Sequence, residues 1–385
     1  MMKSISIKNL EKLKTRLQAN ALRELKTPSN LIDFSSNDYL GFAKSETIFH
    51  ETHQFLIDNN IKQNGATGSR LLSGNHNLYN KIESFLSDFH QSESATIFNS
   101  GYDANIGFFS SVPQRGDVIL YDEFIHASIR DGIQLSNAKS FKFLHNDLTK
   151  LDEMLKRVQH NNTNIYVVTE SVFSMDGDSP DLVKVSEICK KHNAFLIIDE
   201  AHAVGVFGKN GCGLVQQLNI QNDIFARIIT FGKALGCHGA AILGSQSLQN
   251  YLVNFARSFI YTTGLSPHSL ATIKLAYEQL VISSETEKSQ EYKLQQNIYH
   301  FLEEVKRLNL NFIQSNSAIH CCVIPGNEKI KAISEKLEEK SFDVKAILSP
   351  TVKENQERLR FCLHSYNSKQ EITSILELIN DIMNN

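Results

Sequence analysis

The sequence predicts an α/β protein, with a mostly parallel sheet, helices on both of its faces and a smaller α+β domain at the C-terminal end. Short apolar runs alternate with helical patterns between residues 94 and 244. Strands that are apolar on both faces and separated by helices are typical of a parallel sheet with covered faces. After about residue 290 the elements become shorter and more mixed. We therefore expect three parts: an N-terminal helix and arm (1–45), a large domain (46–290) and a small C-terminal domain (291–385).

The first elements along the chain are helices. Apolar residues at helical spacing before Pro28 predict an amphipathic helix at the start of the chain: Leu10, Leu13, Leu17, Leu22 and Leu25. The same spacing predicts a second helix that carries Leu78, Ile82, Phe85, Leu86 and Phe89.

The strands of the predicted sheet are the apolar runs 94–98, 117–121, 164–170, 194–199, 226–231 and 240–244. Helix candidates lie between them, near 102–111, 126–136, 147–159 and 181–192. Long helices are expected over 245–305. The C-terminal domain is predicted from runs at 318–324, 343–348 and 358–363, with helices near 328–340 and from about 368.

Composition excludes several classes of function. The 385 residues include 39 Lys and Arg against 42 Asp and Glu, a net charge of −3, which argues against binding to nucleic acid or acidic membranes. No stretch approaches the roughly 18 apolar residues of a membrane span, and the N-terminus lacks the apolar segment of a signal peptide. The six cysteines show neither C-x-x-C pairs nor zinc spacing. We expect a cytoplasmic protein without a metal site.

Three strand ends carry polar residues, and ligands of open α/β sheets bind beyond the carboxyl ends of the strands. Asp199 ends an apolar run and is followed by His202; alone, such an aspartate is as often a helix cap as a ligand. Lys233 lies in a glycine-flanked turn between two apolar runs. Gly101 and Tyr102 follow the run at 94–98 and open a helix, where backbone N–H groups can bind a phosphate.

A phosphate turn, a strand-end carboxylate and a confined lysine together suit pyridoxal phosphate, which has a phosphate, a pyridine ring and an aldehyde. Asp199 would pair with the protonated ring nitrogen, and burial would make the amine of Lys233 nucleophilic. Two other readings lack support. Residues 199–202 spell a helicase box, but the chain has no phosphate-binding loop of the type such motors need, and no G-x-G-x-x-G follows the first strand for a nicotinamide cofactor.

The sequence resembles the α-oxoamine synthases from about residue 20 to its C-terminus. These are homodimeric, fold-type I pyridoxal phosphate enzymes that condense an amino acid with an acyl thioester. The motifs that carry the resemblance are NDYLG (37–41), GSRLLSGNH (68–76), SGYDAN (100–105), HAS (126–128), TESVFSMDGD (169–178), DEAHAVGVFG (199–208), TFGKALG (230–236) and RLRF (358–361). TESVFSMDGD and the Asp-x-x-His…Thr-x-x-Lys series are specific, whereas the glycine turns alone would not be.

The resemblance implies a role for individual residues of the cofactor site. Lys233 would hold the cofactor covalently, with Asp199 on the ring nitrogen and His126 stacked on the ring. The remaining cofactor contacts would be His202 and Ser174 near the phenolic oxygen, Gly101, Tyr102 and Thr230 at the phosphate, and Thr263 reaching the phosphate of the partner subunit.

For the substrates, the resemblance implies that Arg360 holds the amino-acid carboxylate and that Arg23, Asn37 and Thr351 line the acyl side. The implied reaction is the decarboxylative condensation of L-alanine with a pimeloyl thioester, carried by coenzyme A or a carrier protein, to 8-amino-7-oxononanoate in biotin biosynthesis. Glycine-using relatives tend to read CGT at 73–75, where this chain has SGN.

Two positions depart from the pattern. Asn367, near His364 and Tyr366, stands where many members have histidine, and Arg70 stands where some have histidine. Three alternatives therefore stay open: a sister synthase such as a glycine C-acetyltransferase, a fold-type I aminotransferase, and a catalytically silent cofactor-binding or regulatory protein. The intact Lys233 argues against the last.

Overall fold

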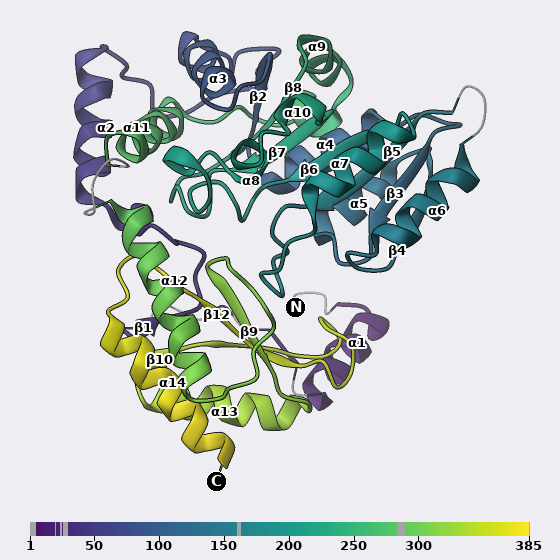
Figure 1. Cartoon of the computed structure of the whole chain (residues 1–385). Helices are drawn as coiled ribbons and strands as arrows, with labels where there is room; N and C mark the ends of the chain where they lie inside the picture. Colours follow the sequence, from purple (N-terminus) through teal and green to yellow (C-terminus); the bar gives the residue numbers. More distant parts are fainter. Residues whose placement is uncertain are drawn as a thin grey trace.

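A seven-stranded sheet forms the centre of the larger part of the molecule. The computed structural model describes residues 5–19, 21–23, 25, 30–159, 163–283 and 289–384. The strand order is β2-β8-β7-β6-β5-β3-β4 (Figure 1). The strands are β2 (Ser94–Phe98), β3 (Val118–Asp122), β4 (Lys139–Phe143), β5 (Ile165–Glu170), β6 (Phe195–Asp199), β7 (Ala226–Thr230) and β8 (Ala240–Gly244).

Strand β8 alone runs antiparallel to its neighbours β2 and β7, and the other pairs of this sheet are parallel. Only residues 231–239 connect β7 to β8. A parallel crossover needs a dozen or more residues, so this link is too short and the chain must turn back. The link carries Lys233, which is thereby held at the carboxyl end of β7. The prediction of a mostly parallel sheet is confirmed.

Helices cover both faces of this sheet, because successive strand residues point to opposite sides. Ile119 of β3 packs in a cluster with Phe108 and Ile129 from the helices of one face. The next residue, Leu120, packs on the other face with residues such as Leu155. The helices of this part include α3 (Asn77–Phe89), α4 (Gly101–Ser111), α5 (Ala127–Leu135), α6 (Leu148–Val158), α7 (Leu182–Lys191), α8 (Leu214–Gln217), α9 (Gln246–Phe255) and α10 (Arg257–Ile260).

The C-terminal part is built on a three-stranded antiparallel sheet with the order β11-β12-β9. Figure 1 labels its strands β9 and β12. Its strands are β9 (Ile319–Val323), β11 (Lys345–Ile347) and β12 (Arg358–Cys362), and its helices are α12 (Gln290–Arg307), α13 (Asn327–Glu339) and α14 (Lys369–Asn384). Strand β1 (Ile32–Asp33) of the N-terminal arm pairs in parallel with β10 (Phe342–Asp343). The arm is therefore hydrogen-bonded to the C-terminal part through this pair of strands.

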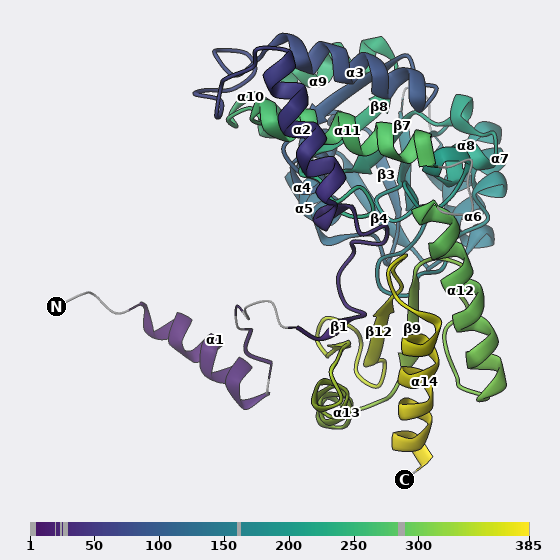
Figure 2. The same ribbon diagram turned by 90° about the vertical axis from the view of Figure 1, so that its left-hand side faces the viewer.

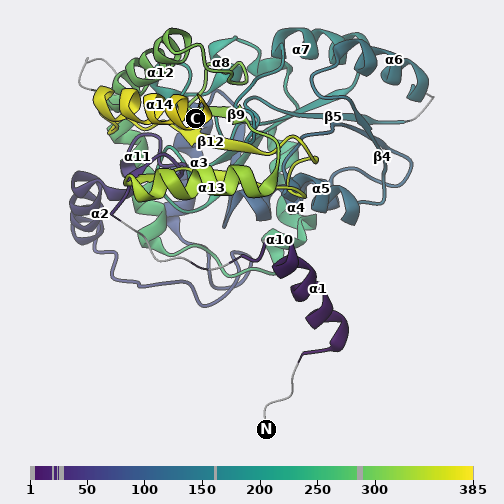
Figure 3. The same ribbon diagram turned by 90° about the horizontal axis from the view of Figure 1, so that it is seen from below.

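Several elements differ from expectation or were missed, among them one helix near the start of the chain, one further helix and one edge strand. The predicted first helix, α1 (Ile7–Gln18), ends well before Leu25. None of its residues is buried, so tertiary packing does not stabilise a longer helix. Without packing, a helix of this length is only marginally stable in water. Figures 2 and 3 show α1 extending away from the body of the chain. Helix α2 (Glu46–Asp58), which packs on α11 (Pro267–Ser283), and the edge strand β4 were not predicted.

The structure also bears on membrane association. Within the described ranges, no helix combines the length and the apolar character that crossing a membrane requires.

A fully buried ion pair supports the strand that carries Asp199. Glu200, the next residue, points the other way, and its Oε2 accepts from Arg227 Nε at 2.9 Å and Nη2 at 2.5 Å. Its Oε1 accepts the Val215 N–H at 3.0 Å. Glu200 is 0% and Arg227 3% exposed. Removing one member of such a pair leaves an uncompensated buried charge.

Glu200→Gln is therefore expected to lower the free energy of unfolding by on the order of 3 kcal/mol, because Arg227 loses its counter-charge. Denaturant unfolding of the variant checks this. In the double variant with Arg227→Met, part of the loss should be recovered. An unfolding midpoint unchanged by Glu200→Gln alone would contradict the assignment.

Candidate active site

Lys233 is the centre of a cluster at the carboxyl ends of β5, β6 and β7. Its Nζ lies 2.6 Å from His202 Nε2, and His202 Nδ1 lies 2.7 Å from the Tyr39 hydroxyl. His202 and Tyr39 are buried. The structure thus brings together the predicted Lys233 and His202, and it adds Tyr39, which the sequence reasoning had not singled out although it lies in the NDYLG motif.

Asp199 is the last residue of β6 and is held from both sides. Its Oδ1 accepts the Ala201 N–H at 2.9 Å, and its Oδ2 accepts from Asn105 Nδ2 at 3.1 Å. Asn105 also donates to Ser128 Oγ at 2.9 Å. The side chain is 6% exposed. Asp199 is therefore a fixed, largely desolvated carboxylate beside Lys233, whose charge it influences.

A second carboxylate, Glu170, was missed from the sequence. It ends β5 and lies in register with Asp199. Its Oε1 accepts the backbone N–H of His126 at 2.5 Å. Burial, together with the charge of Asp199, raises the pKa of Glu170 to about 8. Only the register of β5 and β6 reveals that the two carboxylates are neighbours.

His126 caps the N-terminus of α5, because its Nδ1 accepts the Ser128 N–H at 3.2 Å. The same Nδ1 lies 2.7 Å from Ser128 Oγ. His126 keeps part of its surface exposed, so a planar ligand could stack on its ring. Partial burial lowers the pKa of His126, against the raising effect of Asp199. The predicted ring-stacking residue thus stands at the same end of the sheet as Lys233 and Asp199.

The predicted phosphate turn opens helix α4, with Ser100 as its N-cap. Gly101 and Tyr102 are the first helical residues, whose N–H groups have no acceptor inside a helix. A Cβ on Gly101 would lie 3.7 Å from Thr230, so the absence of a side chain keeps open a cradle between them. The phenolic group of Tyr102 points elsewhere, to Asp131 at 2.7 Å.

Thr263 is exposed and lies in the link between α10 and α11. Its carbonyl oxygen accepts from Asn99 Nδ2 at 2.6 Å. Asn99 directly precedes Ser100. This hydrogen bond therefore holds the backbone of Thr263 next to the phosphate turn of its own chain.

Arg360 of β12 brings the C-terminal part to the Lys233 cluster. Its Nε donates to the Ser174 carbonyl oxygen at 2.7 Å and its Nη2 to Asn37 Oδ1 at 3.1 Å. Its Nη1 lies 2.9 Å from Cys362 Sγ. Ser174 therefore contacts the site through its backbone, and the role predicted for its hydroxyl stays a prediction. Arg360 is 8% exposed, a buried cation suited to a carboxylate.

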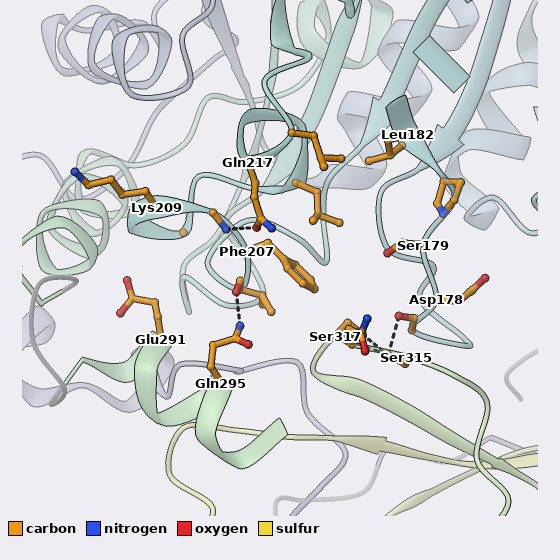
Figure 4. Close-up of a pocket in the computed structure, with 18 of the residues that line it drawn as sticks. Asp178, Ser179, Leu182, Phe207, Lys209, Gln217, Glu291, Gln295, Ser315 and Ser317 are labelled. Carbon is orange, nitrogen blue, oxygen red and sulfur yellow. Dashed lines mark hydrogen bonds between the residues drawn. The ribbon is translucent and has the colours of Figure 1, made fainter. Parts of the chain in front are cut away.

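The three residues predicted for the acyl side do not lie together. Asn37 belongs to the Lys233 cluster, where it also accepts from Tyr39 at 3.1 Å. Arg23 and Thr351 line a separate cavity of about 480 Å³ between the N-terminal segment and the C-terminal part. Another cavity, of about 1140 Å³, lies beside the loops after β5 and β6, and its lining includes polar residues such as Gln217 and Gln295 (Figure 4).

The two departures from the family pattern lie in structural positions. Asn367 is buried; its Oδ1 accepts the His364 N–H at 2.9 Å, and its Nδ2 donates to the Asp33 carbonyl at 3.1 Å. Arg70 pairs with Glu83 at 2.5 Å and stacks 3.8 Å above the ring of Tyr79. Within the described part of the chain, the hydrogen bonds of both residues go to neighbouring side chains and backbone and none goes to Lys233.

These residues fit pyridoxal phosphate. The fit rests on the glycine-lined cradle at Gly101 and Thr230, the fixed carboxylate of Asp199, and the amine of Lys233. Burial lowers the pKa of Lys233 to about 8, although Asp199 and Glu170 act in the opposite direction. An ordinary lysine, with a pKa of about 10.4, is almost wholly protonated at neutral pH.

The rate at which the cofactor-free protein captures pyridoxal phosphate covalently is expected to depend on the neutral fraction of Lys233. It should rise about tenfold per pH unit below pH 8 and level off above. Absorbance spectroscopy over pH 6–10 measures this rate, with Lys233→Ala as the blank. A midpoint near 10 would show that Lys233 is not desolvated.

Comparison with known proteins agrees with this geometry. The chain matches the family described as aminotransferase class I and II over residues 29–379. It is 39% identical over 369 residues to the 8-amino-7-oxononanoate synthase of Emericella nidulans, covering 91% of this chain and 89% of that protein.

Two solved structures share the fold. The 8-amino-7-oxononanoate synthase from Francisella tularensis is 30% identical, with a TM-score of 0.78 over 92% of this chain and 98% of that one. The Sphingomonas wittichii serine palmitoyltransferase is 26% identical, with a TM-score of 0.88 over 98% of this chain and 96% of that one. The chain therefore belongs to the class I and II aminotransferase family and, within it, to the α-oxoamine synthases, which are pyridoxal phosphate-dependent acyltransferases of fold type I.

Proposed function

We propose that this enzyme condenses L-alanine with a pimeloyl thioester, of coenzyme A or a carrier protein, to give 8-amino-7-oxononanoate, CO₂ and the free thiol in biotin biosynthesis. The observation that carries the proposal is the meeting of Lys233, Asp199 and Arg360 at one end of the sheet. A pyridoxal phosphate enzyme that acts on an amino acid needs an amine, a fixed carboxylate and a cation for the substrate carboxylate, and these three residues supply them. The names of the relatives support the choice of substrates.

Each residue has a defined task in this reaction. The guanidinium of Arg360 binds the alanine carboxylate and so orients the Cα–H bond. Lys233, whose pKa of about 8 lies close to neutral pH, takes the Cα proton as general base. Bound pyridoxal phosphate supplies an electron sink for the pair of electrons left at Cα. Asp199 keeps the ring nitrogen protonated by direct charge pairing.

His126 and the turn at Gly101 hold the cofactor in place. The partly exposed ring of His126 offers a stacking face, and the N-terminus of α4 offers two N–H groups to the phosphate. Fixing the ring and its phosphate aligns the substrate Cα with Lys233 for proton transfer.

Product mass spectrometry tests the proposal. Purified protein is incubated with L-alanine or glycine against pimeloyl-coenzyme A, a pimeloyl carrier protein and acetyl-coenzyme A, with Lys233→Ala as the matched control. We expect 8-amino-7-oxononanoate from L-alanine and a pimeloyl thioester. A product only from glycine and acetyl-coenzyme A would replace the proposal with a glycine acetyltransferase.

We further propose a homodimer in which Thr263 serves the phosphate of the partner subunit. Mixing Lys233→Ala subunits with Thr263→Ala subunits should then restore activity, to about a quarter of the wild-type level at random exchange, because one hybrid site keeps both groups. Turnover after verified subunit exchange measures this. If Thr263 serves the phosphate turn of its own chain, beside which Asn99 holds it, the mixture stays inactive.

A further inference from the structure

A continuous chain of hydrogen bonds connects Arg360 to Lys233. Arg360 Nη2 lies 3.1 Å from Asn37 Oδ1, which lies 3.1 Å from the Tyr39 hydroxyl. Tyr39 lies 2.7 Å from His202 Nδ1, and His202 Nε2 lies 2.6 Å from Lys233 Nζ. The chain joins the two groups to which we assign the substrate carboxylate and the substrate proton.

The direction of each bond follows from Arg360, because a guanidinium can only donate. The Asn37 atom that it meets is therefore the amide oxygen. That oxygen also accepts the hydroxyl proton of Tyr39, so the Tyr39 oxygen is left to accept from His202. Nδ1 of His202 must then carry a proton.

The His202 ring is neutral, so its other nitrogen carries none. The side chain is 4% exposed, and burial and the nearby charge of Lys233 hold its pKa well below the usual range. With the proton on Nδ1, the lone pair of Nε2 faces Lys233 and accepts one of its protons.

We propose that Tyr39 is a positioning residue that holds His202 in the neutral tautomer protonated at Nδ1, so that Nε2 is a hydrogen-bond acceptor directed at Lys233. The proposal rests on the proposed function only for the roles of Lys233 and Arg360. Tyr39 is itself fixed, because it is fully buried in an apolar cluster that also contains Ala234 and Leu235 of the Lys233 loop. The opposite tautomer would leave Nδ1 without a proton to donate to Tyr39.

Other charged and titratable groups also act on Lys233, and no variant considered below for this proposal replaces them. They come from the ends of β5 and β6, from the start of α5 and from β12: Glu170, Asp199, His126, Arg360 and Cys362. The Tyr39 hydroxyl also interacts with Arg360, whose charge acts on Lys233, so the protonation of the His202 ring nitrogens has to be observed directly.

The ¹⁵N spectrum of the histidine rings in the full-length, cofactor-free protein tests the tautomer directly. Wild type should show His202 protonated at Nδ1 and not at Nε2. Tyr39→Phe removes only the hydroxyl, and the proton should shift wholly or partly to Nε2. A wild-type ring protonated at Nε2 would overturn the proposal.

The matched control is Tyr277→Phe. Tyr277 is also fully buried, and its hydroxyl lies 2.8 Å from Nε2 of the buried His90. This pair is not a member of the hydrogen-bond chain that connects Arg360 to Lys233. The Tyr277→Phe variant loses a hydrogen bond of the same kind, between a tyrosine and a histidine, and should leave the His202 signals unchanged. An equal change of His202 in both variants would show a general loss of packing and count against Tyr39.

The pH profile of covalent pyridoxal phosphate capture gives a second readout. Losing the acceptor at Nε2 disfavours the charged form of Lys233, so Tyr39→Phe should move the midpoint down by about half a pH unit or more. Asn37→Leu should act in the same direction and replaces Tyr39→Phe if that variant does not fold. Unshifted midpoints in both variants would refute the proposal. Neither experiment uses substrate. If the product assay fails, the proposal about the His202 tautomer is therefore not affected.

Discussion

Lys233→Ala is expected to abolish turnover and covalent binding of the cofactor together. The amine is the group that captures pyridoxal phosphate and the base that takes the substrate proton, so both functions are lost with one side chain. Removing a residue that acts in several steps costs on the order of 10⁴-fold or more in kcat. The product should therefore fall below detection.

Borohydride reduction of the loaded enzyme, followed by peptide mapping, shows where the cofactor is attached. The labelled peptide should contain Lys233. Lys209→Ala is the control, because Lys209 is exposed and lines the cavity of Figure 4; it should retain activity and labelling. Label on another lysine of the wild-type enzyme would disprove the assignment.

Much of the site could be predicted because its residues follow buried strands. Apolar runs ending in Asp199 and in Thr230 mark strand ends, and in an open α/β sheet these ends meet at one edge. The short link after β7 also predicts where Lys233 lies. These signals are local, so one sequence is enough to read them.

The missed residues depend on contacts between distant segments. Glu170 gains its raised pKa from the register of β5 on β6, and Tyr39 is joined to His202 across 163 positions of the chain. Strand β4 was missed for another reason: four of its five residues are exposed, so it lacks the apolar run of the inner strands. A sequence pattern reports burial along one element and carries little information on which elements become neighbours.

Asp199→Asn is the variant that separates charge from shape. The asparagine can keep one bond, accepting the Ala201 N–H through its oxygen. Its new amide hydrogens would face Asn105, whose buried Oδ1 meets no donor among the described residues and can accept them once that amide turns over. The fold and the cofactor should therefore remain in place, and only the negative charge is lost.

With the charge removed, the ring nitrogen is no longer held protonated and the cofactor becomes a poorer electron sink. This loss affects the transition state of proton removal more than the bound substrate. We expect kcat to fall at least about a hundredfold, which corresponds to about 2.7 kcal/mol of barrier. Exchange of the Cα proton of L-alanine in D₂O, followed by NMR without any thioester, should slow by a similar factor.

Glu200→Gln provides the comparison, because Glu200 lies one position along the chain yet bonds Arg227 on the opposite side of the strand. Where that less stable variant is still folded, it should exchange the alanine proton at close to the wild-type rate. Asp199→Asn should show the reverse, with little change in stability and slow exchange. If Asp199→Asn exchanges normally while the folded Glu200→Gln does not, the carboxylate that supports the chemistry is Glu200, and the site must be rebuilt around the other face of β6.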